Sequence, residues 1–422
     1  MRTVFRHIIL KTIERYTRKL IRTHKPIIVG VTGSVGKTST KLAIAHLLEG
    51  DYKVNVHEGN YNTDFGLPLS IFRLDPPKKS SDIVAWLKIL KTIRRTVKED
   101  YPYDVLVLEL GADKPGDIQK FMDYLEPDIG IVTAVAKVHY EAFSSIEHIL
   151  DEKWSLAEGS KKVFYNYDDK RLRNRAEGDM TGYGLTSESS ARALLDKFEP
   201  SKGWSGKFGY QDWEEKLVFP VVGRQSVYAL TVATAVANEL GVSRERCIEA
   251  IESWQQPSGR MQLLTGKKDA TIIDDSYNAS PYSTVAALDA LYRLPGRKVA
   301  ILGSMNELGE YEQEGHEMVG QQCGDLDMLI TIGEAANQYL APAAVESGVD
   351  ISRVHKCNSP YEAGQLMGEA IEDNDSILVK GSQGGVYAEE SIKPLLADTD
   401  DSAKLVRQSD AWQKQKEKEF DA

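Results

Sequence analysis

The hydrophobic positions near the start of the chain follow a helical period and then change to short apolar runs. Between residues 3 and 23, apolar side chains recur at helical spacing, at Val4, Phe5, Ile8, Ile9, Ile13, Tyr16 and Leu20. The other face carries one acid, Glu14, and the cations Arg2, Arg6, Lys11, Arg15, Arg18, Lys19 and Arg22. Such a helix can lie on an anionic membrane surface or pack its apolar stripe on the next domain, and we favour the packed arrangement.

From Pro26 the pattern becomes one of short buried strands separated by helices. Strands are expected at residues 27–31, 105–108, 129–132 and 163–165, and a helix is expected at 38–48. This alternation is typical of a doubly wound parallel α/β sheet. A polar insertion contains an amphipathic helix at 86–97, and residues 226–255 are expected to form two helices.

The segment Gln-Pro-Ser-Gly-Arg at residues 256–260 interrupts the pattern and predicts a hinge. A second α/β series follows, with strands expected at 270–273, 298–303, 328–331 and 376–379. We therefore expect a P-loop-containing central domain with a parallel sheet at residues 26–257 and a smaller Rossmann-like C-terminal α/β domain at 258–400. A basic helix at 1–25 precedes them, and a charged, helical tail follows at 401–422.

Composition and charge narrow the function classes. The 422 residues, 41% hydrophobic and 27% charged, predict a globular protein of two or three domains. The net charge of −11 argues against nucleic acid as the main partner. Three widely spaced cysteines favour reduced structural thiols. No apolar run reaches bilayer length and no signal peptide is recognisable, so we expect a cytoplasmic protein, taken to be a monomer.

The candidate chemistry begins directly after the first strand. The residues there are Gly33, Ser34, Val35, Gly36, Lys37, Thr38 and Ser39. In such a loop the amides and the following helix N-terminus face phosphates, the lysine neutralises charge and the threonine hydroxyl binds Mg²⁺. The general pattern has a glycine five residues before Gly36, where this chain has Val31. The strand, loop, Lys-Thr pair and helix together predict an ATP site.

This shorter loop resembles that of the Mur ligase family, and later segments agree with the resemblance. They are N-Y-N-T-D-F-G-L-P at 60–68, E-L-G-A-D-K-P-G-D-I at 109–118, His139 followed by Glu141, Phe143 and Lys153, P-S-G-R-M at 257–261, D-D-S-Y-N-A-S-P at 274–281 and L-V-K-G-S at 378–382. The last three resemble most the members that add D-alanyl-D-alanine to a muramoyl tripeptide. The resemblance runs from about Pro26 to Leu396.

The resemblance implies an ATP-dependent amide-bond ligase of peptidoglycan synthesis, with a muramoyl peptide and D-Ala-D-Ala as substrates. In such enzymes ATP phosphorylates a carboxylate, and an amine attacks the acyl phosphate. The implied metal ligands for two Mg²⁺ ions are Thr38, Glu109, His139 and a carbamylated Lys153. The resemblance also implies that Arg260 reaches the ATP phosphates, that Asp275 and Asn278 lie near ribose and adenine, and that Lys380 faces the acyl phosphate or substrate.

Taken from the residues alone, three of these positions have plainer interpretations. Glu109, at the end of a buried strand, could pair with a neighbouring lysine instead of holding Mg²⁺. His139 could be a structural residue, and Lys153 could be a solvated lysine on the surface of its helix. Because only a neutral amine reacts with CO₂, burial that lowers the pKa of Lys153 would favour the carbamate.

Two features depart from the family pattern. The G-x-H-N-x-x-N segment is replaced by G-R-Q-S-V-Y-A at 223–229, so no adenine contact is assigned there. Only about 25 residues precede the first strand, where the family has a uridine-nucleotide-binding domain, so recognition is expected through the peptide. The alternatives are a related ligase joining another acid and amine, or a non-catalytic nucleotide-binding partner. The combination of Glu109, His139, Lys153 and Arg260 argues against the non-catalytic alternative.

Overall fold

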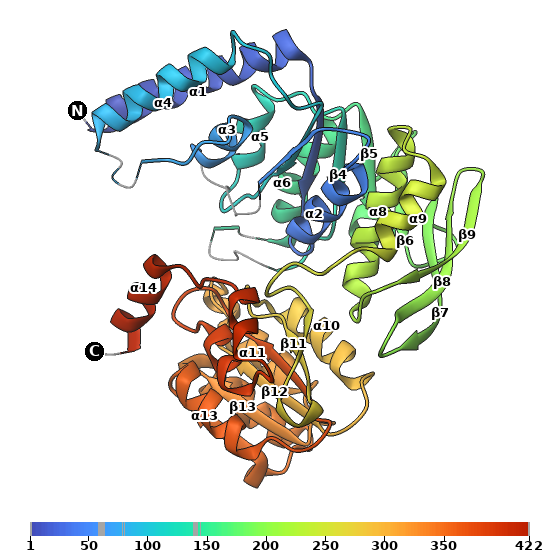
Figure 1. Ribbon diagram of the computed structural model, residues 1–422, viewed down its shortest axis with the longest axis vertical. Coiled ribbons are helices and arrows are strands. Elements are labelled where there is room, and N and C mark those ends of the chain that lie inside the picture. The colour runs from blue at the N-terminus through green and yellow to red at the C-terminus, as the bar shows by residue number, and fades with distance from the viewer. Residues whose placement is uncertain are drawn as a thin grey trace.

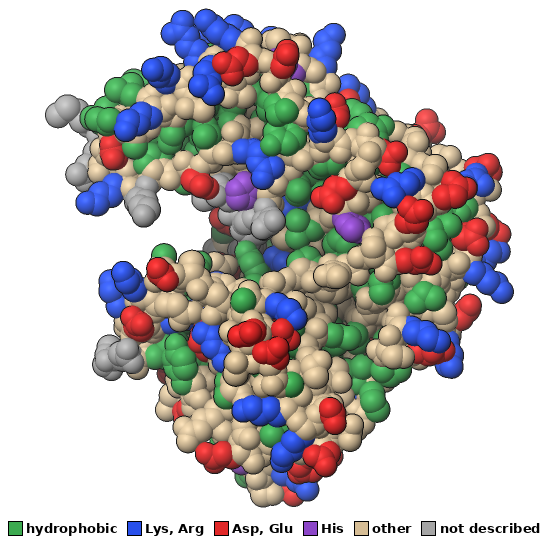
Figure 2. Space-filling view, in the orientation of Figure 1, with side chains coloured by type: hydrophobic (Ala, Val, Ile, Leu, Met, Phe, Trp, Pro, Cys, Tyr) green, Lys and Arg blue, Asp and Glu red, His purple; other side chains and the backbone are tan. Residues whose placement is uncertain are grey.

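The protein consists of two lobes, each built around its own β-sheet (Figure 1). The computed structural model describes residues 2–57, 64–77, 79, 81–137, 142–143 and 145–420. The first lobe contains the chain up to about residue 257, and the second contains most of the remainder. Figure 2 shows the surface hollowed between the two lobes.

The first lobe contains a nine-stranded sheet in the order β2-β3-β1-β4-β5-β6-β7-β8-β9. Its strands are β1 Ile27–Thr32, β2 Val54–Val56, β3 Val105–Glu109, β4 Ile129–Val132, β5 Lys162–Asn166, β6 Thr181–Gly184, β7 Ala191–Glu199, β8 Gly203–Tyr210 and β9 Trp213–Phe219. The strands from β2 to β7 are parallel, whereas β7, β8 and β9 form an antiparallel meander. The expected α/β class is confirmed, and the meander was not predicted.

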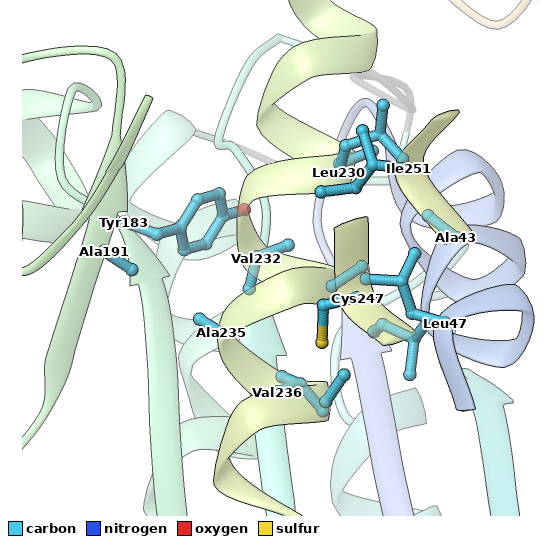
Figure 3. Close-up of a cluster of buried hydrophobic side chains, with 14 of the residues drawn as sticks. Ala43, Leu47, Tyr183, Ala191, Leu230, Val232, Ala235, Val236, Cys247 and Ile251 are labelled. Carbon is cyan, nitrogen blue, oxygen red and sulfur yellow. The ribbon is translucent and has the colours of Figure 1, made fainter. Parts of the chain in front are cut away.

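Helices cover both faces of this sheet. They are α1 Arg2–His24, α2 Lys37–Leu48, α3 Gly66–Ile71, α4 Ile83–Thr96, α5 Asp117–Met122, α6 Ile146–Glu158, α7 Lys170–Arg175, α8 Arg224–Glu239 and α9 Arg244–Glu252. Figure 3 shows Leu230 of α8 and Ile251 of α9 beside Ala43 and Leu47 of α2, in one buried cluster with Tyr183 of β6. This packing holds α2, and with it the loop at its N-terminus, against the sheet.

The second lobe contains a six-stranded sheet in the order β10-β11-β15-β12-β13-β14, parallel except for β10. Its strands are β10 Gln262–Thr265, β11 Thr271–Asp274, β12 Lys298–Gly303, β13 Met328–Ile332, β14 Val354–Cys357 and β15 Ser376–Lys380. Its helices are α10 Pro281–Tyr292, α11 Glu312–Gly320, α12 Ala341–Glu346 and α13 Pro360–Ala370, and the tail forms α14 Asp410–Phe420. Shorter helical turns lie at Lys267–Asp269, Gly309–Tyr311, Ala336–Leu340, Ile351–Arg353, Ala388–Ser391, Lys393–Leu395 and Thr399–Lys404.

Helix α1 packs on the first lobe, as we favoured from the sequence. Ile9, Ile13 and Leu20 are buried in the same hydrophobic cluster as Trp86 of α4. Ile8, which was assigned to the apolar stripe, is 57% exposed. The buried stripe is therefore narrower than the sequence pattern. Within the described ranges, no helix has both the length and the apolar character needed to cross a bilayer.

The three cysteines are free and buried. Burial raises the pKa of Cys247 and of Cys323 to about 12 and that of Cys357 to about 11. Because the thiolate is the reactive form, these thiols are inert at neutral pH. This agrees with the structural role expected for them.

Candidate active site

The phosphate-binding loop lies at the carboxyl edge of the first sheet, between two neighbouring strands. Strand β1 pairs with β3 so that Val31 lies opposite Glu109, and with β4 so that Thr32 lies opposite Val132. The residues that follow these strands therefore meet at one edge, which is where ligands bind in open α/β sheets.

The segment after β4 fixes the shape of the loop. Gly33 has a φ of 142°, and a Cβ at this position would lie 2.0 Å from Thr133 Oγ1. Thr133 Oγ1 donates to the carbonyl of Val35 at 2.6 Å, and the Ser34 amide donates to the carbonyl of Ala134 at 2.8 Å. Glycine is therefore required at position 33 by both backbone conformation and space.

The loop ends at the N-terminus of α2, which is left open for an anion. Gly36 precedes the helix with a φ of 87°, and no side chain caps the first turn. The first N–H groups of a helix have no intrahelical partner, so those of Lys37, Thr38 and Ser39 point toward the space in front of the helix. This arrangement suits a phosphate group.

Two side chains of α2 meet Glu109. Thr38 Oγ1 donates to Glu109 Oε2 at 2.8 Å, and Lys41 Nζ lies 3.1 Å from the same oxygen. Lys37 Nζ donates back to the Gly33 carbonyl at 2.8 Å. The pairing that the sequence left open for Glu109 is thus present, with Lys41 as the partner. Thr38 and Glu109 together offer two neighbouring oxygen atoms, the donor type that Mg²⁺ prefers.

Burial and charge shift the pKa values of this group in opposite ways. Burial alone would raise the pKa of Glu109, but the cations of Lys41, Lys37 and Arg260 outweigh burial and lower it. Burial lowers the pKa of Lys37, and Glu109 offsets part of that effect. Glu109 therefore remains a carboxylate at neutral pH, as a metal ligand must.

Lys153 is buried, contrary to the plainer interpretation of it as a solvated surface lysine. It lies on α6, only 2% of it is exposed, and its Nζ is 3.5 Å from the Ala112 carbonyl. Burial, followed by the nearby Lys37 cation, lowers the pKa of Lys153 to about 7. A large fraction of this amine is neutral at physiological pH, which is the condition that carbamylation requires.

Glu152 holds the segment that Lys153 contacts. Its carboxylate accepts hydrogen bonds from the Gly116 amide at 2.6 Å and the Ile118 amide at 2.7 Å. These amides belong to the start of α5, so the buried acid is satisfied by the helix N-terminus. Glu152 therefore positions the chain between Glu109 and α5.

Arg260 connects the second lobe to the phosphate loop. Its Nη2 donates to Thr38 Oγ1 at 3.0 Å, although the two residues are 222 positions apart. The guanidinium also stacks over the Tyr277 ring, 4.0 Å from the centroid. Aromatic stacking fixes the plane of an arginine. The hinge arginine is thus already directed at the loop.

Asp275, Asn278 and Lys380 meet at the carboxyl edge of the second sheet. Strands β11 and β15 pair in parallel with Asp274 opposite Val379, so the next residues of both strands lie side by side. Lys380 Nζ lies 2.5 Å from Asp275 Oδ2 and donates to the Asn278 carbonyl at 3.0 Å. Burial raises the pKa of Asp275, and the Lys380 ammonium offsets part of the rise. The three residues form one polar cluster.

Two of the predicted site segments cannot be placed. His139 and the N-Y-N residues 60–62 lie outside the described residues. Within the described ranges, no group of three or more His, Cys, Asp or Glu side chains is arranged to hold a metal ion. Thr38 and Glu109 are thus the metal-ligand candidates whose mutual geometry is established.

Sequence reasoning missed Lys41, Glu152 and Tyr277. A signal existed for Lys41, because residues three apart share a helix face and Lys41 follows Thr38 at that spacing. Tyr277 lay inside a recognised segment, but no role was assigned to it. Nothing in the sequence pattern distinguished Glu152 from the surface acids around it. Its role depends on the approach of α5.

Comparison with known proteins places the chain in a family. Residues 31–237 match the Mur ligase middle domain, and residues 259–383 match the domain described as Mur ligase, glutamate ligase domain. The UDP-N-acetylmuramoyl-tripeptide–D-alanyl-D-alanine ligase of Bacillus subtilis (strain 168) is 27% identical over 376 residues, covering 87% of this chain and 76% of that protein. The enzyme of the same name from Mycobacterium tuberculosis (strain ATCC 25618 / H37Rv) is 30% identical over 392 residues, covering 84% of this chain and 70% of that protein.

The fold agrees with a solved structure. The MurF ligase from Thermotoga maritima in complex with ADP superposes with a TM-score of 0.74 at 24% identity, covering 94% of this chain and 83% of that one. The family resemblance predicted from the sequence is confirmed by these matches. The chain belongs to the Mur ligase family.

Proposed function

We propose that this protein is an ATP-dependent ligase that joins D-alanyl-D-alanine to a UDP-N-acetylmuramoyl tripeptide in peptidoglycan precursor synthesis. The observation that carries the proposal is that side chains from both lobes contact Thr38. Its hydroxyl contacts Glu109 from the first lobe and Arg260 from the second. The two sequence relatives described above, each matching more than four-fifths of this chain, bear the name of that enzyme.

The reaction consists of two displacements whose atoms balance. The terminal carboxylate of the tripeptide attacks the γ-phosphorus of ATP, forming an acyl phosphate and releasing ADP. The amine of D-Ala-D-Ala then attacks the acyl carbon, phosphate leaves and the amine loses a proton. Lys37 and the N-terminal amides of α2 neutralise charge on the phosphates, and Arg260 adds a cation from the second lobe.

Two further assignments belong to the proposal. Magnesium, when bound, neutralises phosphate charge, and Thr38 and Glu109 are the described residues with the oxygen atoms to hold it. Lys153 reacts as the neutral amine with CO₂, its nitrogen bonds to the carbon and loses a proton to solvent, and the resulting carbamate places an anion beside this site. The burial of Lys153 and its pKa of about 7 support this assignment. On the second lobe, Lys380 and Asp275 face the reacting end of the substrate and the nucleotide.

The test is synthesis of the pentapeptide product from the UDP-linked tripeptide, D-Ala-D-Ala and ATP, followed by mass spectrometry and phosphate release. One phosphate should appear for each amide formed, and omission of either substrate should abolish both signals. Lys153→Ala should be nearly inactive and partly restored by acetate, whereas Lys153→Arg should stay inactive because arginine forms no carbamate. Full activity of Lys153→Arg would contradict the carbamate assignment.

A ligase that joins a different acid and amine is the second candidate. The chain departs from the family's adenine-contacting G-x-H-N-x-x-N segment at 223–229, where Arg224 lies over the Trp204 ring at 5.1 Å, so the substrates of the relatives need a direct test in this chain. Tyr228 of the same segment donates to Asp168 at 2.8 Å. A panel of acids and amines in the phosphate-release assay decides between the two. Turnover with another pair, and none with the muramoyl tripeptide, would support the second candidate.

A further inference from the structure

Helices α1 and α4 concentrate positive charge on one edge of an acidic protein. Together they carry eleven Lys and Arg side chains and one acid, Glu14. The two helices have a net charge of +10. Because the net charge of the whole chain is −11, the rest of the chain has a net charge of −21. In Figure 2, Lys and Arg side chains gather along the edge where Figure 1 places these helices. The charge is therefore segregated, and the net charge of the chain does not describe this edge.

The packing of α1 leaves its basic face outward and joins it to α4. A groove of about 610 Å³ between the two helices is walled by the cations Lys11, Arg15 and Lys19 from α1 and by Arg94 and Lys98 at the end of α4. Lys11 is paired with Glu14 at 2.8 Å, but the other four form no ion pair with any described residue. Residues 11 to 19 span roughly 12 Å along a helix, so the cations of the groove are spread along the surface and not gathered at one point.

Apolar side chains are exposed on the same pair of helices. At the start of α4, Ile83 is 53%, Val84 is 63% and Leu87 is 61% exposed, and Ile8 of α1 is 57% exposed. The opposite face of α4 is used for packing, since Trp86 and Ile93 are buried. Several large apolar side chains that are exposed to solvent on one turn of a helix favour binding to a partner with an apolar interior.

We propose that the α1–α4 edge is a docking surface for an anionic lipid bilayer, with the groove cations on the phosphate headgroups and Val84 and Leu87 in the acyl boundary. Charge complementarity alone would also fit nucleic acid. The apolar side chains have no counterpart on a phosphate backbone, whereas a bilayer accommodates both kinds of contact. The ligase would then act while attached to the membrane surface.

The test is flotation of the full-length protein with vesicles of phosphatidylcholine alone and of phosphatidylcholine containing phosphatidylglycerol. Four cations near an anionic surface contribute a partition factor on the order of a thousandfold. Replacing Arg15, Lys19, Arg94 and Lys98 by glutamine should therefore lower the partition coefficient on anionic vesicles at least a hundredfold. The matched control replaces four other exposed cations by glutamine, namely Lys53, Lys216, Arg353 and Lys356.

A second variant separates lipid from other polyanions. Val84→Ser with Leu87→Ser should lower vesicle binding about tenfold, because two apolar side chains lose their burial, and should leave heparin binding unchanged. Circular dichroism and ligation in vesicle-free buffer should be unchanged in all three variants. Equal binding of the groove variant and the control, or binding to heparin with none to vesicles, would overturn the proposal. So would a serine variant that binds vesicles as well as the parent.

Discussion

The substitution Lys153→Met should raise the stability of the folded protein while abolishing its ligase activity. The amine is buried and its pKa falls from 10.5 to about 7. Between these two pH values the unfolded chain binds a proton that the folded chain does not, so stability rises with pH through this window. At about 1.4 kcal/mol for each pH unit, folding with this lysine costs about 4 kcal/mol at pH 7 and about 1.5 kcal/mol at pH 9.5.

Methionine occupies a similar volume and carries no proton to lose. The variant should therefore be more stable than the parent by up to about 4 kcal/mol at pH 7. At pH 9.5 this gain in stability should be smaller by about 2.5 kcal/mol. Urea unfolding in CO₂-free buffer, followed by tryptophan fluorescence, measures both values. Trp154, the next residue along α6, is itself buried and reports on this region. The same variant should be inactive as a ligase.

Lys41→Met is the matched control, because Lys41 is equally buried but has an acidic partner. Its loss breaks the buried ion pair with Glu109, which typically costs about 3–5 kcal/mol, and the charges of Lys37 and Arg260 offset part of this cost. The two substitutions should therefore shift stability in opposite directions. A stabilisation by Lys153→Met that did not change between pH 7 and pH 9.5 would refute the depressed pKa, and the carbamate assignment would lose its physical basis.

The remaining predictions concern the phosphate site. Lys37→Ala should lower kcat about 10²–10³-fold without changing the fold, and a rate within twofold of the parent in amide synthesis would contradict the role of the loop. Glu109→Gln should lower the rate and raise the Mg²⁺ concentration needed for half-activation, because a neutral amide is a poorer ligand; an unchanged activation curve would exclude Glu109 as a ligand. Arg260→Lys should lower kcat/KM for ATP about 10–100-fold, because lysine cannot reproduce the charged hydrogen bonds of the guanidinium. A loss below twofold would contradict a role of Arg260 at the ATP phosphates.

The features that sequence predicted best depend on neighbours along the chain. The loop at 33–39 and Glu109 could be placed because each follows an apolar run directly, and parallel strands present their carboxyl ends at one edge. Asp275 and Lys380 were instead assigned from the family resemblance. Their pairing with each other depends on which strands are adjacent, and the order of strands in a sheet is not written in any local pattern.

What sequence could not provide depends on tertiary packing. Lys153 has the local pattern of a surface lysine, and only the approach of the segment near Ala112 buries it. The meander of β7, β8 and β9 lacks continuous apolar runs, since charged or small residues interrupt each of its strands, so it was not predicted. Likewise, the amphipathic helix at 86–97 was expected, but its alignment beside α1 was not. The groove between them exists only because the two basic helices lie together.

The contact between Arg260 and Thr38 links the arrangement of the two lobes to whatever binds at the Thr38 hydroxyl. If Thr38 holds magnesium, as proposed, the ion and the Arg260 guanidinium would be two cations at the same hydroxyl, and neighbouring like charges repel each other. Metal at this position would therefore oppose the contact between Arg260 and Thr38, and the phosphates of a bound nucleotide would offer the arginine a new partner. By thermodynamic linkage, anything that holds the lobes in the present arrangement must weaken metal binding by the same factor. On the proposed assignment, binding of metal and nucleotide would therefore favour an arrangement of the lobes other than the one described here.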